Sequence, residues 1–130
     1  MKLERVYRKS KKVDELIQQN FGPGESLWKP KCFDLLYKLV DGQKILAVCT
    51  LQWSAEGYWI LGDVCSVTHG HGFGSEIIRR VCERTHEPIW ADATHPGSGK
   101  ILERNSFRPT TVQPWKPEGT ALFRAATMSV

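Results

Sequence analysis

The sequence predicts a single α/β (α+β) domain with a mixed, mostly antiparallel central sheet and helices on both faces. Three observations support this fold class. The chain has 130 residues, enough for one domain with its own core. Apolar residues alternate through the middle of the chain, as in strands, and recur at helical spacing on either side of it. A glycine-rich loop then leads from an extended segment directly into an amphipathic helix.

The first part of the chain predicts one strand followed by one helix. Leu3 to Arg8 has strand character, and Ser10 is positioned to cap the helix. Gly22 and Pro23 are expected to end it. The apolar stripe of this helix consists of Val13, Leu16, Ile17 and Phe21.

The middle of the chain predicts a three-strand antiparallel meander. Asp41-Gly42 supplies a tight turn into a strand over Lys44 to Trp53. A polar turn separates that strand from another over Tyr58 to Val64. The strand before them is expected to carry on one face Phe33, Leu35, Tyr37 and Leu39.

The last part of the chain predicts two further helices and two further strands. The helices are expected over Ser75 to Thr85 and over Gly97 to Asn105. The strands are expected over Ile89 to Ala93 and over Ala121 to Ala126. A strand, a glycine-rich turn, a helix and a short strand in succession predict one parallel crossover within the sheet.

Composition excludes several classes of protein. The chain is 41% hydrophobic and 25% charged, as in soluble globular proteins. Its longest apolar run, Ile45 to Leu51, is far shorter than the roughly 20 residues of a membrane-spanning helix. The charged N-terminus does not have the apolar region of a signal peptide. We therefore expect a cytoplasmic protein with no membrane association.

The cysteines are interpreted as free thiols in apolar segments. An alternative is a zinc site that combines Cys65 with His69 and His71, and Cys82 with His86. No paired C-x-x-C or H-E-x-x-H spacing accompanies these residues, so no metal is expected. The four cysteines are Cys32, Cys49, Cys65 and Cys82.

Part of the net charge of +4 lies in a basic N-terminal cluster. Such a cluster attracts phosphate or nucleic acid. A solvated surface is the favoured interpretation, because the sequence has no nucleic-acid-binding motif, and nucleic acid is not expected as a partner. The cluster consists of Arg5, Arg8, Lys9, Lys11 and Lys12.

The segment from His69 to Ser75, HGHGFGS, carries the most informative chemistry. Its glycines, Gly70, Gly72 and Gly74, allow the backbone to take positive φ and to approach a ligand closely. Because the loop opens into a helix, its free N–H groups and the helix dipole predict an anion site, above all for a pyrophosphate. A tight glycine turn without a ligand is the alternative.

Two common phosphate-binding motifs do not fit this loop. A Walker loop needs Lys-Ser or Lys-Thr after its last glycine, whereas Ser75-Glu76 follows Gly74. A dinucleotide-binding fingerprint needs G-x-G-x-x-G after the first strand of a βαβ unit. Here the glycines alternate strictly and follow a meander.

The segment from Val64 to Gly74 resembles the cofactor motif of the GNAT superfamily of acetyl-CoA-dependent N-acetyltransferases. The family's V-x-P-x-x-R-G-x-G-x-G spacing maps onto this segment without a gap. A second match lies downstream, where Lys100 to Phe107, KILERNSF, is similar to the family's A-x-x-L-Y-E-K-L-G-F signature. Together with the strand order, the resemblance covers roughly residues 33 to 123 and implies a GNAT-like fold.

The resemblance implies that acetyl-CoA is the cosubstrate and that the loop amides bind its pyrophosphate. The pantetheine arm would run beside Val64 and Cys65 between two splayed strands. The backbone N–H of Cys65 would stabilise the oxyanion that forms at the thioester carbonyl. The implied cofactor-binding residues are Val64, Cys65, Ser66, His69, Gly70, His71, Gly72, Phe73, Gly74, Ser75 and His95.

Three positions depart from the family's pattern. His69 stands where the motif has arginine or glutamine, and His95 where an asparagine often contacts the cofactor. Both histidines are able to donate hydrogen bonds. Leu102 replaces the tyrosine that commonly protonates the leaving thiolate, so no general acid is assigned.

Asp63 is the candidate general base. An acceptor ammonium must lose a proton before it attacks, and Asp63 directly precedes Val64 and so points to the opposite face of the strand. A structural carboxylate at a strand end is the alternative. A covalent acyl intermediate at Cys65 has only its position in its favour, so direct transfer is expected.

The sequence thus predicts an N-acetyltransferase that moves the acetyl group of acetyl-CoA directly to an amine on a protein or a small molecule. One alternative, motivated by Leu102, is a catalytically weak GNAT-like domain that binds acetyl-CoA or a protein partner as a regulator. A small basic nucleic-acid-binding module is the other. The sequence predicts neither the identity of the acceptor nor the oligomeric state.

Overall fold

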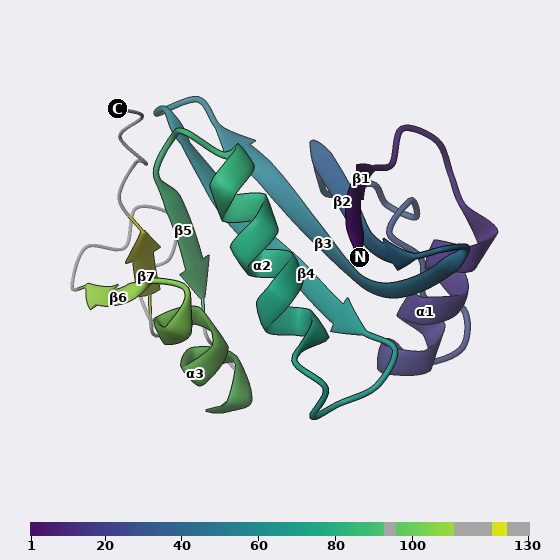
Figure 1. Cartoon of the computed structure of the whole chain (residues 1–130). Coiled ribbons are helices and arrows are strands. Elements are labelled where there is room, and N and C mark those ends of the chain that lie inside the picture. Colours follow the sequence, from purple (N-terminus) through teal and green to yellow (C-terminus); the bar gives the residue numbers. More distant parts are fainter. Residues whose placement is uncertain (93–95, 111–120, 125–130) are drawn as a thin grey trace.

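A computed structural model describes residues 1–92, 96–110 and 121–124. Its strands form one seven-stranded sheet in the order β1-β2-β3-β4-β5-β7-β6 (Figure 1). The strands are β1 (Lys2–Arg5), β2 (Leu35–Asp41), β3 (Lys44–Ser54), β4 (Tyr58–Ser66), β5 (Ile89–Asp92), β6 (Arg108–Thr110) and β7 (Ala121–Arg124). The helices are α1 (Lys11–Phe21), α2 (Phe73–Arg84) and α3 (Pro96–Arg104).

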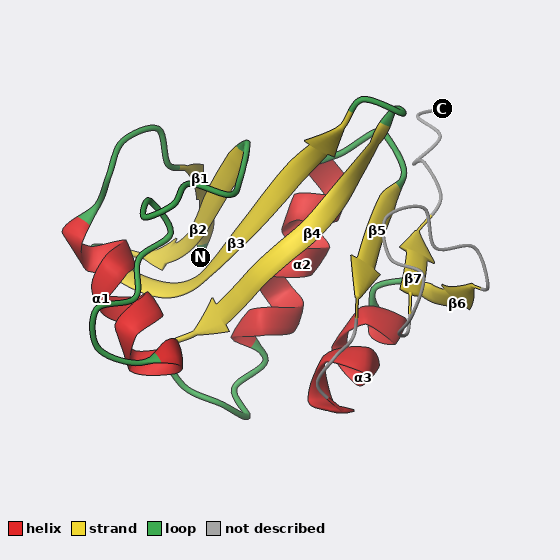
Figure 2. Cartoon of the chain, turned by 180° about the vertical axis from the view of Figure 1, so that it is seen from behind, coloured by secondary structure: helices red, strands yellow, loops and turns green. Residues whose placement is uncertain are grey.

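The sheet is antiparallel apart from one pair of neighbouring strands. β4 and β5 run parallel because α2 crosses over between them, and the other pairings are antiparallel. One face of the sheet carries α1, and the other carries α2 and α3 (Figures 1 and 2). The predicted fold class, a mixed and mostly antiparallel sheet with helices on both faces, is therefore confirmed.

Two hydrophobic clusters hold the helices on the sheet. The cluster under α2 and α3 contains Leu51 of β3, Ile77 of α2 and Phe107, which follows α3. The cluster under α1 contains Val13 of that helix and Val48 of β3. Alternate residues of β3 thus enter different clusters, as expected for a strand that is covered on both faces.

The first helix begins and ends where the sequence predicts. The Ser10 Oγ accepts a hydrogen bond from Val13 N at 3.3 Å, which satisfies one of the free N–H groups at the helix start. Gly22 ends the helix with a φ of 117°. Phe21, predicted to belong to the buried stripe, is instead 54% exposed at the last turn.

The strands differ from the prediction mainly at their ends. β1 ends at Arg5 rather than at Arg8, and β2 begins at Leu35 rather than at Phe33. Phe33 therefore does not share a strand face with Leu35, and it packs against the cluster under α1. The strand β6, which contains Pro109, was not predicted. A proline in a short run is atypical of a strand.

The later elements lie close to their predicted ranges. α2 begins at Phe73, two residues before the predicted start, and β4 continues to Ser66. The predicted strand ends at Ala93 and Ala126 lie outside the described residues. Within the described part of the chain, no helix is both long enough and apolar enough to cross a membrane.

The C-terminus of α3 forms a Schellman motif with an unusual residue in its turn. Ser106 N donates to Glu103 O at 3.1 Å, and Phe107 N donates to Leu102 O at 3.0 Å. Ser106 has a φ of 71° and is the one residue other than glycine with positive φ in the described chain. Glycine is the usual residue at this position, because it has no Cβ to clash in the left-handed conformation.

Replacing Ser106 with glycine is expected to stabilise the protein by about 0.5–1 kcal/mol. The left-handed conformation costs an L-residue about 1–2 kcal/mol, and the greater freedom of glycine in the unfolded chain offsets part of that gain. Thermal unfolding should show a Tm about 2–4 °C higher. Ser106→Ala is the control, because it removes the hydroxyl and keeps the strain; an equal gain in Ser106→Ala would contradict the backbone explanation.

Candidate functional site

β4 and β5 separate after a short contact. Their parallel pairing covers two residue pairs, Trp59 with Ile89 and Ile60 with Trp90. Beyond these pairs the two strands diverge (Figure 2). The last residues of β4 therefore have no strand partner on the β5 side within the described chain. Backbone N–H and C=O groups on such an edge are available to an extended ligand.

A β-bulge lies in β4 near the point of divergence. Cys49 pairs with Val64, and Leu51 pairs with Leu61, so β4 has one extra residue opposite Thr50. As a result Leu61 and Val64, three residues apart, both pack against the cluster under α2. Strict alternation would place them on opposite faces. The bulge therefore changes the direction of the side chains that enter the open edge.

The extra residue is held by the hydroxyl of Thr50. This side chain is buried, and its Oγ1 accepts a hydrogen bond from Asp63 N at 2.8 Å. A Cβ at Gly62 would lie 2.5 Å from Thr50 Oγ1, which is too close for any side chain. Sequence reasoning missed Thr50 and Gly62, because Thr50 and Asp63 are 13 residues apart and no local pattern links them.

The register also determines which amides of β4 face the opening. Val67 N donates to Leu46 O of the β3 side at 2.9 Å, and N–H groups alternate between the two edges of an antiparallel strand. The N–H of Cys65 therefore points toward β3, and those of Val64 and Ser66 point toward the open edge. The amide that was predicted as oxyanion donor, the Cys65 N–H, thus points toward β3 in this register, and the Val64 N–H is the amide that faces the open edge.

The loop between β4 and α2 contains two glycines in the left-handed backbone conformation. Gly70 and Gly72 have φ values of 81° and 77°, and a Cβ on either would meet nothing within 4 Å. Backbone conformation rather than crowding therefore requires glycine here. Gly74 differs, because it lies in the first turn of α2 without positive φ. A Cβ at Gly74 would be in ordinary contact with Ile101 and Val64, at 3.9 and 4.0 Å, so the predicted role of positive φ at Gly74 is wrong.

The first amides of α2 have no helical partner. Gly72 is the N-cap residue and provides no side-chain cap, and the first helical bond runs from Glu76 N to Gly72 O at 2.9 Å. The N–H groups that precede this bond, those of Phe73, Gly74 and Ser75, are left free by helix geometry. α1 has a serine cap, whereas the start of α2 is open and so is suited to an anion.

Glu76 places a carboxylate in this first turn, and two arginines neutralise it. Glu76 Oε1 lies 2.7 Å from Arg80 Nε and also pairs with Arg79. Hydrogen bonds from Arg79 and Arg80 lower the pKa of Glu76 to about 2, so this side chain is ionised and paired at neutral pH. The carboxylate is therefore balanced locally and opposes an anion at the helix start only weakly.

Asn105 connects the end of α3 with the first turn of α2. Its Nδ2 lies 3.3 Å from Ser75 Oγ, 3.4 Å from Ser75 O and 2.9 Å from Ile101 O. This contact fixes the position of Ser75 relative to α3. Ser75 was predicted as a cofactor-binding residue at the start of a helix, but Asn105, which is 30 residues away, was not identified.

The Asp63 backbone is held by its hydrogen bond to Thr50, and its carboxyl group has a raised pKa. Alternation from Val64 places its side chain on the α1 face of the sheet, opposite the cluster that Val64 enters. Desolvation raises the pKa of Asp63 above its ordinary value of 3.8, and outweighs a backbone hydrogen bond that lowers it. The side chain still contacts solvent. A carboxylate with a raised pKa accepts a proton more readily.

Cys65 lacks the properties of a nucleophile. It is 3% exposed and packs in the cluster under α1. Burial, reinforced by the negative charge of Asp63, raises the pKa of the Cys65 thiol to about 12. The thiol therefore stays protonated at neutral pH, and the thiolate is the reactive form. This supports direct transfer over an acyl-cysteine intermediate.

The remaining predicted residues have different surroundings. His69 and His71 are exposed in the loop, and the His71 ring stacks on Phe73 with centroids 5.8 Å apart. Leu102 is 4% exposed within the core and presents only hydrocarbon. His95 lies outside the described residues. In the part of the chain that the structure describes, no three His, Cys, Asp or Glu side chains are grouped to hold a metal.

No family model and no curated protein sequence matches the chain. Its structure is similar to that of a Bacillus subtilis acetyltransferase in complex with CoA, with a TM-score of 0.71, 9% identity and coverage of 97% of this chain and 98% of that chain. The ribosomal-protein-S18-alanine N-acetyltransferase of Escherichia coli has a TM-score of 0.70 at 13% identity, with 99% and 96% covered. The aminoglycoside 6'-N-acetyltransferase of Enterococcus faecium has a TM-score of 0.72 at 8% identity, with 100% and 99% covered. The chain therefore has the fold of the GNAT acetyltransferases.

Proposed function

We propose that this protein is an N-acetyltransferase that uses acetyl-CoA as its cosubstrate and transfers the acetyl group directly to an amine. The observation that carries the proposal is the combination of an open β4 edge with an uncapped helix start, joined by a loop with two left-handed glycines. An extended arm and an anionic group need these two features side by side. The GNAT fold, shared with a CoA-bound acetyltransferase, supports the same assignment.

The pyrophosphate of acetyl-CoA would bind the free amides of Phe73, Gly74 and Ser75 at the start of α2. The loop residues His69 and His71, which are exposed, would donate further hydrogen bonds. The pantetheine arm would continue along the open edge of β4. There the N–H and C=O groups of Val64 and Ser66 provide a strand-like set of partners.

The transfer itself requires a base and an oxyanion donor. The neutral amine attacks the thioester carbonyl carbon, so that a C–N bond forms, the C–S bond breaks and the thiolate of CoA leaves. The Val64 N–H, which points away from β3, would stabilise the oxyanion. Asp63 accepts the proton that the amine loses, directly or through water.

The thiolate must then gain a proton, and this chain has no side-chain acid at the position of Leu102. We infer that water supplies this proton. The same observation favours a second candidate function, a catalytically weak domain that binds acetyl-CoA as a regulator. The acyl donor would bind in the same way in both cases, and the two functions differ in turnover.

One experiment separates these functions. The pure protein is titrated with acetyl-CoA by calorimetry and then incubated with acetyl-CoA and a panel of amines, while free thiol and acceptor mass are measured. Binding together with stoichiometric thiol release and acetylated amine supports the enzyme. Binding without turnover on any amine supports the regulator, and no binding at millimolar acetyl-CoA contradicts both.

Asp63→Asn is expected to lower kcat by about 100-fold near neutral pH, with little change in acetyl-CoA affinity, because general base catalysis contributes about 10²–10⁴. For the wild-type protein, activity should fall as the pH drops through the raised pKa of Asp63, and the pH profile of Asp63→Asn should lack this decrease.

The raised pKa also means that ionisation of Asp63 opposes folding above that pKa. Asp63→Asn should therefore be no less stable at pH 7, and unchanged turnover would return Asp63 to a structural role.

A further inference from the structure

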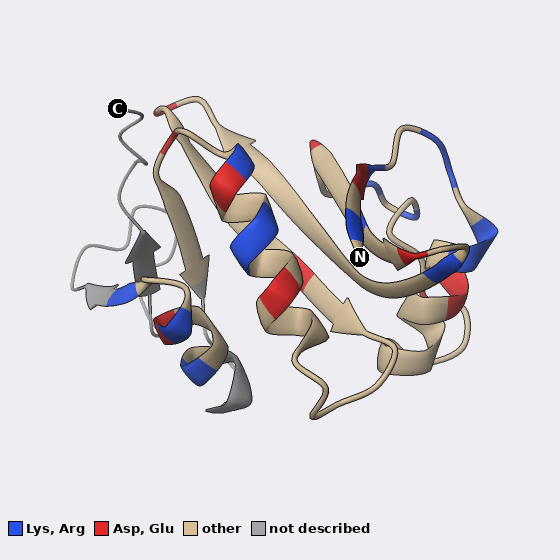
Figure 3. Cartoon of the chain, in the orientation of Figure 1, with Lys and Arg blue, Asp and Glu red and all other residues tan. Residues whose placement is uncertain are grey.

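The net positive charge of the protein comes from its first third. Residues 1–44 contain ten Lys and Arg against six Asp and Glu, whereas the remaining residues contain eight of each. The net charge of +4 therefore belongs to β1, α1, β2, their connections and Lys44, the first residue of β3. In Figure 3 the basic segments gather on the loop before α1 and on the first turn of that helix.

The cations at the start of α1 form no salt bridges with described residues, although Asp14 and Glu15 follow them in the helix. Within the described residues, the salt bridges all lie on α2, where Glu76 and Glu83 pair with arginines. Four exposed cations lie just before α1 or in its first turn, and none of them forms an ion pair with a described residue. They are Arg8, Lys9, Lys11 and Lys12.

Two of these cations lie where they disfavour the helix. Lys11 and Lys12 are the first residues of α1, at the positive end of the helix dipole, where an anion is favoured and a cation is not. The helix has no basic residue in its last turn, where one would be favourable. These lysines are unfavourable at the helix start and gain no salt bridge within the described chain in return, and such an arrangement indicates a functional role.

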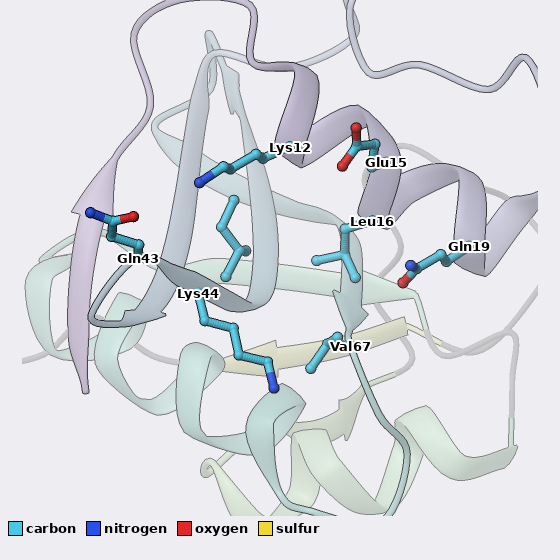
Figure 4. Close-up of a pocket in the computed structure, with 8 residues that line it drawn as sticks. Lys12, Glu15, Leu16, Gln19, Gln43, Lys44 and Val67 are labelled. Atoms are coloured by element: carbon cyan, nitrogen blue, oxygen red, sulfur yellow. The ribbon is translucent and has the colours of Figure 1, made fainter.

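A shallow groove opens beside these residues, between α1 and the turn that joins β2 to β3 (Figure 4). Its volume is about 240 Å³. Lys12 comes from the α1 wall and Lys44 from the opposite wall, so cations flank the groove on both sides. Its apolar lining is formed by Leu16, Ile45 and Val67.

We propose that this groove binds an acidic segment of a polypeptide acceptor. The proposal rests on the acetyltransferase function and names its substrate class. Carboxylates of the segment meet Lys12 and Lys44, and an aliphatic side chain between them contacts the apolar floor. Gln19 and Gln43, which also line the groove, hydrogen-bond its backbone. A small polycationic amine would be repelled at the same place.

The groove is on the same face of the sheet as the Asp63 side chain. Val67, in its floor, follows Asp63 by four residues, or ~13 Å of extended chain. Cys65, which lies between them, is buried under α1, so a polypeptide must pass around that helix and this distance is the minimum. A polypeptide that occupies the groove and presents an amine to Asp63 therefore has its acidic residues at least about four positions from the reacting amine. This spacing defines the peptides to be tested.

The test compares the binding of two decapeptides with a C-terminal fluorescein and a free N-terminal amine. One carries three glutamates from the fourth to the sixth position, and in the other these are glutamines. Fluorescence anisotropy with the 130-residue protein, at saturating CoA, which cannot acetylate the peptide, gives the two affinities. We expect the glutamate peptide to bind at least about tenfold more tightly at low salt, with an advantage that shrinks as salt is added.

Charge variants locate the binding surface. Lys12→Glu and Lys44→Glu should each weaken the glutamate peptide about three- to tenfold and leave the glutamine peptide unchanged. Glu15, the one acidic residue in the described lining, allows the opposite change, and Glu15→Gln should strengthen the glutamate peptide. Lys100→Glu, an exposed position on α3 at the other face of the sheet, is the matched control. Circular dichroism confirms that each variant is folded.

The outcomes for the groove and for the enzyme are distinguishable. Equal affinity of the two peptides, or an equal loss in Lys100→Glu, would overturn the groove even if both peptides are acetylated. Tighter binding of a 12-nucleotide oligouridine than of the glutamate peptide would assign the surface to nucleic acid and overturn it as well. If the protein binds the glutamate peptide more tightly than the glutamine peptide but does not bind acetyl-CoA, the groove proposal is supported and the acetyltransferase proposal is contradicted.

Discussion

Replacing Gly72 with valine is expected to reduce acetyl-CoA affinity at least about 100-fold while the protein stays folded. Gly72 has a φ of 77°, a conformation that a β-branched residue does not adopt without strain. The turn must therefore change, and with it the direction of the amides of Phe73 to Ser75. Two lost hydrogen bonds to a charged phosphate, at about 1.5–3 kcal/mol each, account for the decrease. Calorimetric titration with acetyl-CoA measures it.

Gly57→Val is the matched control for this variant. Gly57 has a φ of 99° in the turn between β3 and β4, and a Cβ there would meet nothing within 4 Å, as at Gly72. The two substitutions impose similar backbone strain, but only one lies in the loop before α2. Normal binding by Gly72→Val would show that the loop does not hold the phosphates. A loss in Gly57→Val of the same size would instead attribute the effect to general destabilisation.

Gly62→Ala is expected to destabilise the protein by about 2–3 kcal/mol and to lower turnover at least tenfold. The new Cβ would lie 2.5 Å from Thr50 Oγ1, so the Thr50 side chain must rotate or β4 must move. Rotation leaves the Asp63 N–H without its buried partner, which costs about 1–3 kcal/mol. Either change displaces the Val64 amide and the Asp63 carboxylate. Denaturant unfolding and acetyl transfer measure the two effects.

A double-mutant cycle shows whether the Thr50 hydroxyl causes this effect. Once Thr50→Ala has removed Oγ1, the nearest remaining atoms of Thr50 lie 3.7 Å from a Cβ at Gly62, an ordinary contact. Gly62→Ala should therefore cost little in the Thr50→Ala background, although Thr50→Ala alone is destabilising. Strictly additive effects of the two substitutions would contradict a direct contact.

The fold was predictable because its signals are local. Ser10 and Gly22 mark the ends of α1, and Asp41-Gly42 marks the first hairpin, at single positions of the sequence. The errors arose where tertiary contacts decide. Phe33 alternates with the residues of β2 but packs on the other face, and β6 forms only because β7 pairs with it.

The sequence predicted more of the loop between β4 and α2 than of the part of the candidate site that lies in β4. The alternating glycines indicated an anion site, yet the sequence did not reveal that Gly70 and Gly72 have positive φ and that Gly74 is helical. The bulge in β4 depends on Thr50 of the neighbouring strand, and it changes which amide faces the opening. The sequence of one strand does not contain this register, so it cannot indicate which amides face the open edge.

Beyond the two residue pairs where β4 and β5 contact each other, the separation of these strands depends on packing volume rather than on hydrogen bonds between them. The two halves of the sheet share one core, in which Leu51 of β3, Ile77 of α2 and Ile89 of β5 belong to the same cluster. Side chains beneath the sheet therefore act as spacers between the halves. A methylene added or removed at Ile77 would change the separation of the two strands without touching a ligand. In the proposed enzyme, the fit of the acyl donor therefore depends in part on residues that never contact it.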